Sequence, residues 1–152
     1  MTQCDPDSFN EDMKAATAVW VKRLQANDAA GVSDLFCTGD TASIIGQGRL
    51  LGTVSHTLRG VTPERPGIRD YFDYFANRKN IKVVQSEMYP QAISCDVGVN
   101  NVFATIEDDV NGSVDTQMSY VWRKDSSKDT GMCLALLHSS VVPSRHEPLY
   151  GK

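Results

Sequence analysis

Helical spacing of hydrophobic residues dominates the first part of this 152-residue chain, and strand-like runs dominate the part after residue 80. The first helical stripe consists of Phe9, Met13, Ala16, Trp20 and Leu24. These positions recur every three or four residues, which predicts an amphipathic helix capped by Asp7 or Ser8 and ending near Ala26. Trp20 is in register with the stripe, so we interpret it as a core residue.

Shorter elements follow this helix. The stretch "ANDAAG" at 26–31 interrupts the helical pattern, and a short second helix is predicted around Val32, Leu35 and Phe36. Residues 41–60 carry brief apolar runs separated by glycines, which predicts two short strands or a strand and an extended arm. A start signal at 62–64 opens a third helix, which ends near 77–79. Its buried stripe is Ile68, Tyr71, Phe72 and Phe75.

From residue 81 the pattern predicts four long antiparallel strands, joined by turns at Pro90, at 96–98 and at Asn111-Gly112. In the last strand neither alternating set of positions is polar, so we expect both faces to be covered. We expect one set to face the protein interior, namely Met132, Leu136 and His138. We expect the other set to face the sheet of a second subunit, namely Cys133, Ala135, Leu137 and Ser139.

Composition narrows the class of protein. With 41% hydrophobic residues, 1–152 is expected to form one domain with a core at about 9–143 and a polar tail at 144–152. The net charge of −4 and the scattered Lys and Arg residues argue against nucleic acid as a partner. No apolar run approaches a membrane span, and the acidic N-terminus lacks the features of a signal peptide. We therefore expect a cytoplasmic protein without a membrane partner.

Cysteine and histidine spacing argues against metal sites. Cys4, Cys37, Cys95 and Cys133 are widely separated and form no C-x-x-C pair, so reduced thiols are expected rather than disulfides or a zinc site. The three histidines are also far apart, and the catalytic motifs of common hydrolases, nucleotide-binding proteins and metalloproteases are absent from the sequence. We expect no metal and no cofactor.

The order of elements resembles the nuclear-transport-factor-2-like fold, which ketosteroid isomerases, SnoaL-like cyclases and the association domain of calcium/calmodulin-dependent protein kinase II share. The stretch "LLGTVSHTLRGVTPERPGIRDYFDYF" is similar to the region before and through the third helix of small bacterial association-domain relatives. "YVWRKD" and "LHSS" resemble the last two strands of that domain. The resemblance implies an α+β, cystatin-like fold in which a cone-shaped, curved antiparallel sheet wraps around three N-terminal helices.

The resemblance also bears on chemistry. A ketosteroid-isomerase-like enzyme needs a carboxylate base where this chain carries Ile44 or Ile45. The association domain carries arginines at the positions similar to Thr105 and Tyr120, so we expect either a small neutral or aromatic ligand or no ligand at all. We predict that the ligand-binding residues line the cone interior. They are Asn101, Phe103, Thr105, Tyr120, Trp122 and His138.

Two functions follow as hypotheses. The preferred one is a self-associating, association-domain-like module, a homodimer or higher oligomer, with a small-molecule pocket and no catalytic set. The alternative is a SnoaL-like or ketosteroid-isomerase-like enzyme, an isomerase, cyclase or dehydratase acting on a small hydrophobic substrate. That enzyme would use His138 as the acid or base and Tyr120 as a hydrogen-bond donor. If the chain is not such an enzyme, we expect His138 to be a core histidine that is hydrogen-bonded to a neighbour such as Tyr120.

Overall fold

The computed structural model describes residues 5–38, 42–46, 54–55, 67–76, 80–110 and 112–142. Within these residues lie three helices, α1 (Pro6–Gln25), α2 (Ala29–Ser33) and α3 (Ile68–Ala76). Two short strands, β1 (Ser43–Ile45) and β2 (Val54–Ser55), precede α3. Four long strands follow it: β3 (Lys82–Ala92), β4 (Val97–Asp108), β5 (Gly112–Lys124) and β6 (Met132–Val141). The predicted start signal of the third helix, at 62–64, lies outside the described residues.

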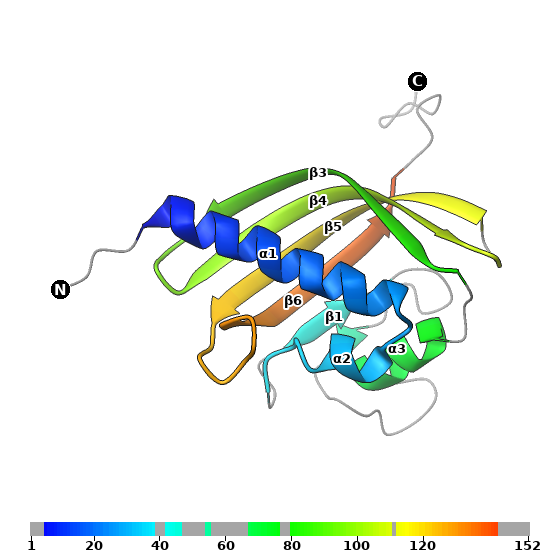
Figure 1. The fold of residues 1–152 in the computed structure, drawn as a ribbon, viewed down its shortest axis with the longest axis horizontal. Helices are drawn as coiled ribbons and strands as arrows, with labels where there is room; N and C mark the ends of the chain where they lie inside the picture. The colour runs from blue at the N-terminus through cyan, green and yellow to red at the C-terminus, as the bar shows by residue number, and fades with distance from the viewer. Residues whose placement is uncertain are drawn as a thin grey trace.

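The strands form one curved sheet in the order β2-β1-β6-β5-β4-β3. Helix α1 lies across one face of this sheet, and α2 and α3 lie together near its β1 side (Figure 1). We refer to the face covered by α1 as the inner face and to the opposite one as the outer face. The predicted α+β fold is confirmed, with one difference: β1 pairs with β6 in parallel, so the sheet is mixed.

The N-cap of helix α1 lies two or three residues earlier than expected. Asp5 is the N-cap, and its carboxylate accepts a hydrogen bond from the Asp7 backbone N–H at 3.1 Å. Pro6 then occupies the first helical turn, where its missing N–H costs nothing. The predicted stripe from Phe9 to Leu24 is buried against the sheet, as its spacing required.

The same helix also protects the edge strand β3. At one end of β3, the backbone N–H of Val83 donates to Oε1 of Gln25 at 2.8 Å. At the other end, the N–H of Ala92 donates to Oδ1 of Asn10 at 2.8 Å. These bonds satisfy backbone groups that an edge strand would otherwise expose for unwanted pairing. The turn predicted at Pro90 is wrong, because Pro90 lies inside β3 opposite Asn100, and an edge strand tolerates proline.

A bulge in β6 changes which residues face inward. Trp122 of β5 pairs with Leu134, but the preceding Val121 pairs with Leu136, so Ala135 has no partner of its own. Beyond the bulge the alternation restarts with the opposite phase. Leu137 is therefore on the inner face and is only 2% exposed.

This bulge corrects the predicted division of β6. Leu136 and His138 lie on the outer face after it, whereas Leu137 and Ser139 are buried on the inner face. The inward-facing residues of β6 are even-numbered before the bulge and odd-numbered after it. Strict alternation therefore assigns apolar residues to both faces. A second sheet is not needed to explain its composition.

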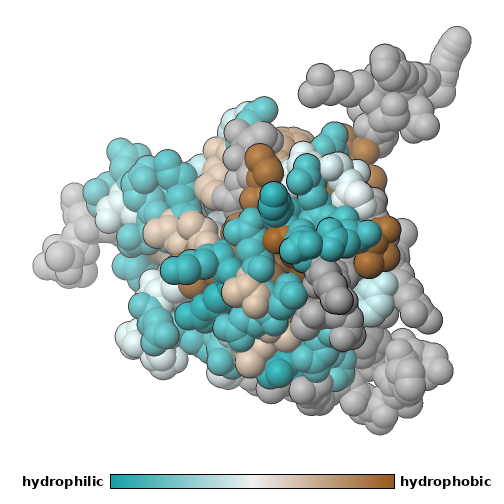
Figure 2. Space-filling model, turned by 45° about the vertical axis from the view of Figure 1, so that its right-hand side comes forward, coloured by the Kyte–Doolittle hydropathy of each residue, from teal (hydrophilic) through white to brown (hydrophobic). Residues whose placement is uncertain are grey.

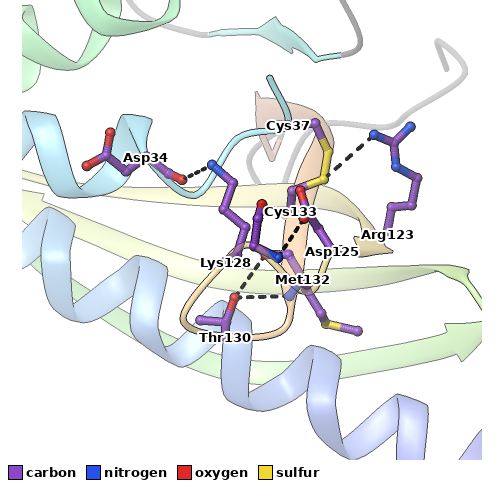
Figure 3. The surroundings of a disulfide bond; sticks show 9 residues. Asp34, Cys37, Arg123, Asp125, Lys128, Thr130, Met132 and Cys133 are labelled. Atoms are coloured by element: carbon purple, nitrogen blue, oxygen red, sulfur yellow. Dashed lines mark hydrogen bonds between the residues drawn. A yellow bond between two sulfur atoms is a disulfide. The ribbon is translucent and has the colours of Figure 1, made fainter. Parts of the chain in front are cut away.

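Cys37 and Cys133 form a disulfide, although reduced thiols were expected at both positions (Figure 3). The residues are 96 positions apart in sequence, and backbone pairing brings them together. The N–H of Cys37 donates to the Leu134 carbonyl at 2.9 Å, and the N–H of Leu134 donates to the Leu35 carbonyl at 2.7 Å. Among the described cysteines, Cys95 is exposed and takes no part in a disulfide. The prediction of reduced thiols is therefore wrong for Cys37 and Cys133.

Aromatic rings fill the centre of the core. Trp20 of α1 packs edge-on against Tyr120 of β5, with centroids 5.2 Å apart, and against Phe72 of α3 at 6.2 Å.

The side of the molecule drawn in Figure 2 carries mainly hydrophilic residues, with small hydrophobic patches at its upper right. In the part of the chain that the structure describes, no helix combines the length and apolar character that crossing a membrane requires.

Candidate functional site

The inner face has a small, partly open cavity of about 20 Å³ between α1, α3 and the sheet. Its apolar walls are Trp20, Leu24, Phe72, Ile106, Met118 and Leu137. Tyr71 and Ser139 complete the lining. Ligand sites usually measure about 300 Å³ or more, so this space is far smaller than a substrate pocket.

Tyr120 is a core residue beside this cavity. Its side chain is fully buried, and its hydroxyl donates to the thioether of Met118, with 3.3 Å between Oη and Sδ. Burial raises the pKa of the Tyr120 phenol far above its ordinary value, because the phenolate would lose its hydration. The group therefore remains protonated and cannot act as a base near neutral pH.

A polar network ties α1 to the sheet through Thr17. The Thr17 hydroxyl donates to the Met13 carbonyl at 2.8 Å. The same oxygen accepts from Nδ2 of Asn100 at 3.0 Å and from Nε1 of Trp122 at 3.1 Å. One hydroxyl thus satisfies two buried donors on neighbouring strands. Trp122, predicted to contact a ligand, instead serves this network.

The outer face exposes three large hydrophobic side chains on β3 and β4. Val84 is 55% exposed, Tyr89 53% and Phe103 41%. The rings of Tyr89 and Phe103 meet edge-on with centroids 6.2 Å apart. The Tyr89 hydroxyl donates to the carboxylate of Glu87, which raises the pKa of Tyr89 and holds its ring in place.

Beside Phe103 the outer face has a hollow of about 170 Å³ between β4, β5 and β6. Its side-chain lining is Asn101, Phe103, Gln117, Ser119, His138 and Ser140. The Ser119 hydroxyl donates to Oδ1 of Asn101 at 2.6 Å across the β4–β5 pair. Amides, hydroxyls and an imidazole give the hollow hydrogen-bonding capacity without a fixed charge from Asp, Glu, Lys or Arg.

The sheet divides the six predicted ligand-binding residues into two groups. Asn101, Phe103 and His138 gather around the outer hollow, and Thr105 lies further along the same face, bonded to Asp115 at 2.8 Å. Tyr120 and Trp122 are on the inner face. The common interior predicted for these residues is therefore wrong for β4, because its even-numbered residues, such as Asn100 and Val102, are the buried ones.

The predicted interface residues also lie elsewhere than expected. Leu137 and Ser139 are buried on the inner face, and Cys133 is fully buried in the disulfide. Ala135 is half-buried at the bulge. Val84 and Tyr89 were not predicted to be exposed. The signal in the sequence is that they alternate with the inward-facing Val83 and Met88 along an edge strand.

Across the six described ranges, no three His, Cys, Asp or Glu side chains gather closely enough to hold an ion.

Comparisons with known proteins identify the fold. No protein-family model matches the sequence, and no curated protein matches it. A proposed dehydratase from the NTF2-like family of Streptomyces avermitilis superposes with a TM-score of 0.70 at 15% identity, over 92% of this chain and 100% of that one. The calcium/calmodulin-dependent protein kinase II hub of S. rosetta gives 0.68 at 14% identity, over 93% and 100%. A proposed association domain of that kinase from Xanthomonas campestris gives 0.66 at 21% identity, over 86% of each chain.

These similarities define the class: the chain has the nuclear-transport-factor-2-like, or cystatin-like, fold. Neighbours with this fold include association domains, a proposed dehydratase and a proposed ketosteroid isomerase. Since one fold serves such different proteins, function has to be argued from the sites of this chain.

Proposed function

We propose that this chain is a self-associating domain, a homodimer or the repeating unit of a higher oligomer, in which the outer sheet faces of two copies pack together. The observation that carries the proposal is the exposed hydrophobic group of Val84, Tyr89 and Phe103. Neighbouring aromatic and aliphatic side chains left in water on a sheet face mark a surface that another protein covers. The similarity in fold to a kinase hub and an association domain favours a second copy as that protein.

The charge pattern of the outer face supports the same proposal. Outward positions of β4, β5 and β6 carry no Asp, Glu, Lys or Arg over 99–105, 117–121 and 136–140. Charged residues lie at the ends of the strands, for example Asp115 and Arg123 on β5, and on the edge strand β3, where Glu87 pairs with Phe103. A neutral centre with a charged rim is the usual composition of a protein–protein interface.

The enzyme alternative lacks a pair of groups that could act together. It required His138 and Tyr120 to reach one substrate, but His138 is exposed on the outer face and Tyr120 is buried on the inner face. The 20 Å³ inner cavity has no room for a substrate. These two observations favour association over catalysis.

Sedimentation velocity at micromolar concentration tests the proposal on the wild type, Phe103→Glu and Ile93→Glu. Ile93 is the matched control, because it is 66% exposed in the β3–β4 turn, beyond the end of β3. We expect the wild type and Ile93→Glu to associate and Phe103→Glu to shift towards monomer, since it places charges at the interface centre. Circular dichroism checks that both variants fold. A monomeric wild type would overturn self-association, whereas an unshifted Phe103→Glu would overturn this choice of face.

A further inference from the structure

Among the described residues, three buried side-chain atoms have no hydrogen-bond partner: Oδ1 of Asn100, Nε1 of Trp20 and Oγ of Ser139. Only the last two belong to residues that line the inner cavity. Trp20 is 3% exposed and Ser139 is 8% exposed, so bulk water does not satisfy these groups. Both residues line the 20 Å³ inner cavity, Trp20 from α1 and Ser139 from β6. Buried polar groups in folded proteins are nearly always paired, which makes two unpaired groups around one cavity a sign of an occupant.

The second tryptophan shows how the same group is satisfied elsewhere in this core. Nε1 of Trp122 donates to Oγ1 of Thr17 at 3.1 Å. Trp20 and Trp122 both stack or pack against Tyr120, so they belong to one aromatic cluster. The difference between them is that Trp20 has no acceptor among the described residues. A water molecule or another bound molecule can supply that acceptor.

We propose that the inner cavity is a binding site for one neutral acceptor oxygen, held between Nε1 of Trp20 and the hydroxyl of Ser139. Trp20 can only donate, so the bound atom must accept, and Ser139 can either donate to it or accept from it. The described part of the lining contains no Lys, Arg or His, so these residues would not compensate a buried carboxylate oxygen. The proposed ligand atom is therefore a neutral one.

The volume of the inner cavity limits which molecule can supply this oxygen. A cavity of about 10 to 15 Å³ by the same measure holds one water molecule. The observed 20 Å³ accommodates a single water, and a small alcohol or ketone would fit only if the apolar walls moved apart. The proposed occupant is accordingly one buried water, and the proposal does not depend on self-association.

A high-resolution crystal structure of the full chain provides the first test. We expect one isolated density peak at hydrogen-bond distance from both Nε1 of Trp20 and Oγ of Ser139, and none at Nε1 of Trp122. Extended density, together with an increased mass in native mass spectrometry, would identify a small molecule whose oxygen occupies the same site. An empty cavity, or direct bonds from both groups to protein atoms, would overturn the proposal.

A double-mutant cycle provides a second test in solution. If Trp20 and Ser139 share one oxygen, the effects of Trp20→Phe and Ser139→Ala on the unfolding equilibrium should be non-additive. The matched control cycle combines Trp122→Phe with Ser139→Ala, which share no oxygen and should be additive. Additive effects in the first cycle would contradict a shared occupant, whatever the oligomeric state.

Discussion

Tyr120 and His138 belong to adjacent strands, but the sheet separates their side chains. Tyr120 pairs with Leu137 and is fully buried on the inner face. His138 pairs with Ser119 and is exposed on the outer face. The two groups therefore cannot exchange a proton with the same substrate. The Tyr120 hydroxyl serves the packing of the core, and its removal tests that role.

Tyr120→Phe should change the free energy of unfolding at neutral pH by less than about 1 kcal/mol, because it removes one weak hydrogen bond to a thioether. The difference should appear in alkali. Since burial raises the folded-state pKa of Tyr120, its stabilising effect is complete below the unfolded value near 10 and is lost as the pH rises above it. Urea titrations between neutral pH and pH of about 11 should show a smaller alkaline loss in Tyr120→Phe than in the wild type.

Tyr89→Phe serves as a comparison, because it removes an exposed phenol without opening the core. Glu87 also raises the pKa of Tyr89, so we expect an effect of the same sign but smaller, since solvent screens this exposed pair. A loss of several kcal/mol at neutral pH in Tyr120→Phe would show that the hydroxyl makes a stronger interaction than the hydrogen bond to Met118.

The elements with strong periodicity could be predicted from sequence. The stripe of α1 and the four long strands were predicted because many positions along each one agree. Which residues of a strand face the core is harder to predict than the strand itself. Asn100 and Asn101 look alike in sequence, and only Asn100 meets Thr17 of α1. At Ala135, one unpaired residue reverses the faces of β6, and nothing in the local sequence marks it as a bulge.

Alanine substitutions at Leu136 and Leu137 test the bulge directly. Leu137→Ala should lower the free energy of unfolding by about 2 to 5 kcal/mol, because it opens a cavity at a buried site. Leu136→Ala, at the half-buried neighbouring position, should cost about 1 kcal/mol. Urea denaturation should be carried out at one fixed protein concentration, since association shifts apparent stability. Equal costs, or a larger cost at Leu136, would restore an unbroken alternation along β6.

The disulfide escaped prediction for a different reason. Cys37 and Cys133 become neighbours only when Phe36 pairs with Leu134 in parallel, a contact between segments almost 100 residues apart. Sequence spacing carries no trace of such a long-range contact. The candidate sites share this dependence on tertiary structure, because the outer hollow combines three strands and the inner cavity combines two helices with the sheet.

Reduction of the disulfide should lower the free energy of unfolding by about 2 to 5 kcal/mol, because the bond closes a long loop in the unfolded chain. Denaturation with and without a reductant measures this loss. The variant Cys95→Ser is the control, and it should stay within about 0.5 kcal/mol of the wild type, since Cys95 is exposed and unbonded. Alkylation of Cys37 and Cys133 in unfolded protein that was never reduced would contradict the disulfide.

Thr17 offers the most specific test of how α1 is held on the sheet. Thr17→Val keeps the side-chain shape but leaves Nδ2 of Asn100 and Nε1 of Trp122 without their shared acceptor. Two buried donors lose a bond at once, so we expect a loss of about 2 to 5 kcal/mol. Thr17→Ser retains the hydroxyl and should cost only about 1 kcal/mol for the missing methyl group. Urea denaturation with an unchanged m-value measures both losses. If Thr17→Val were no worse than Thr17→Ser, the hydroxyl would contribute packing alone, and the register of α1 on β4 and β5 would depend on its hydrophobic stripe.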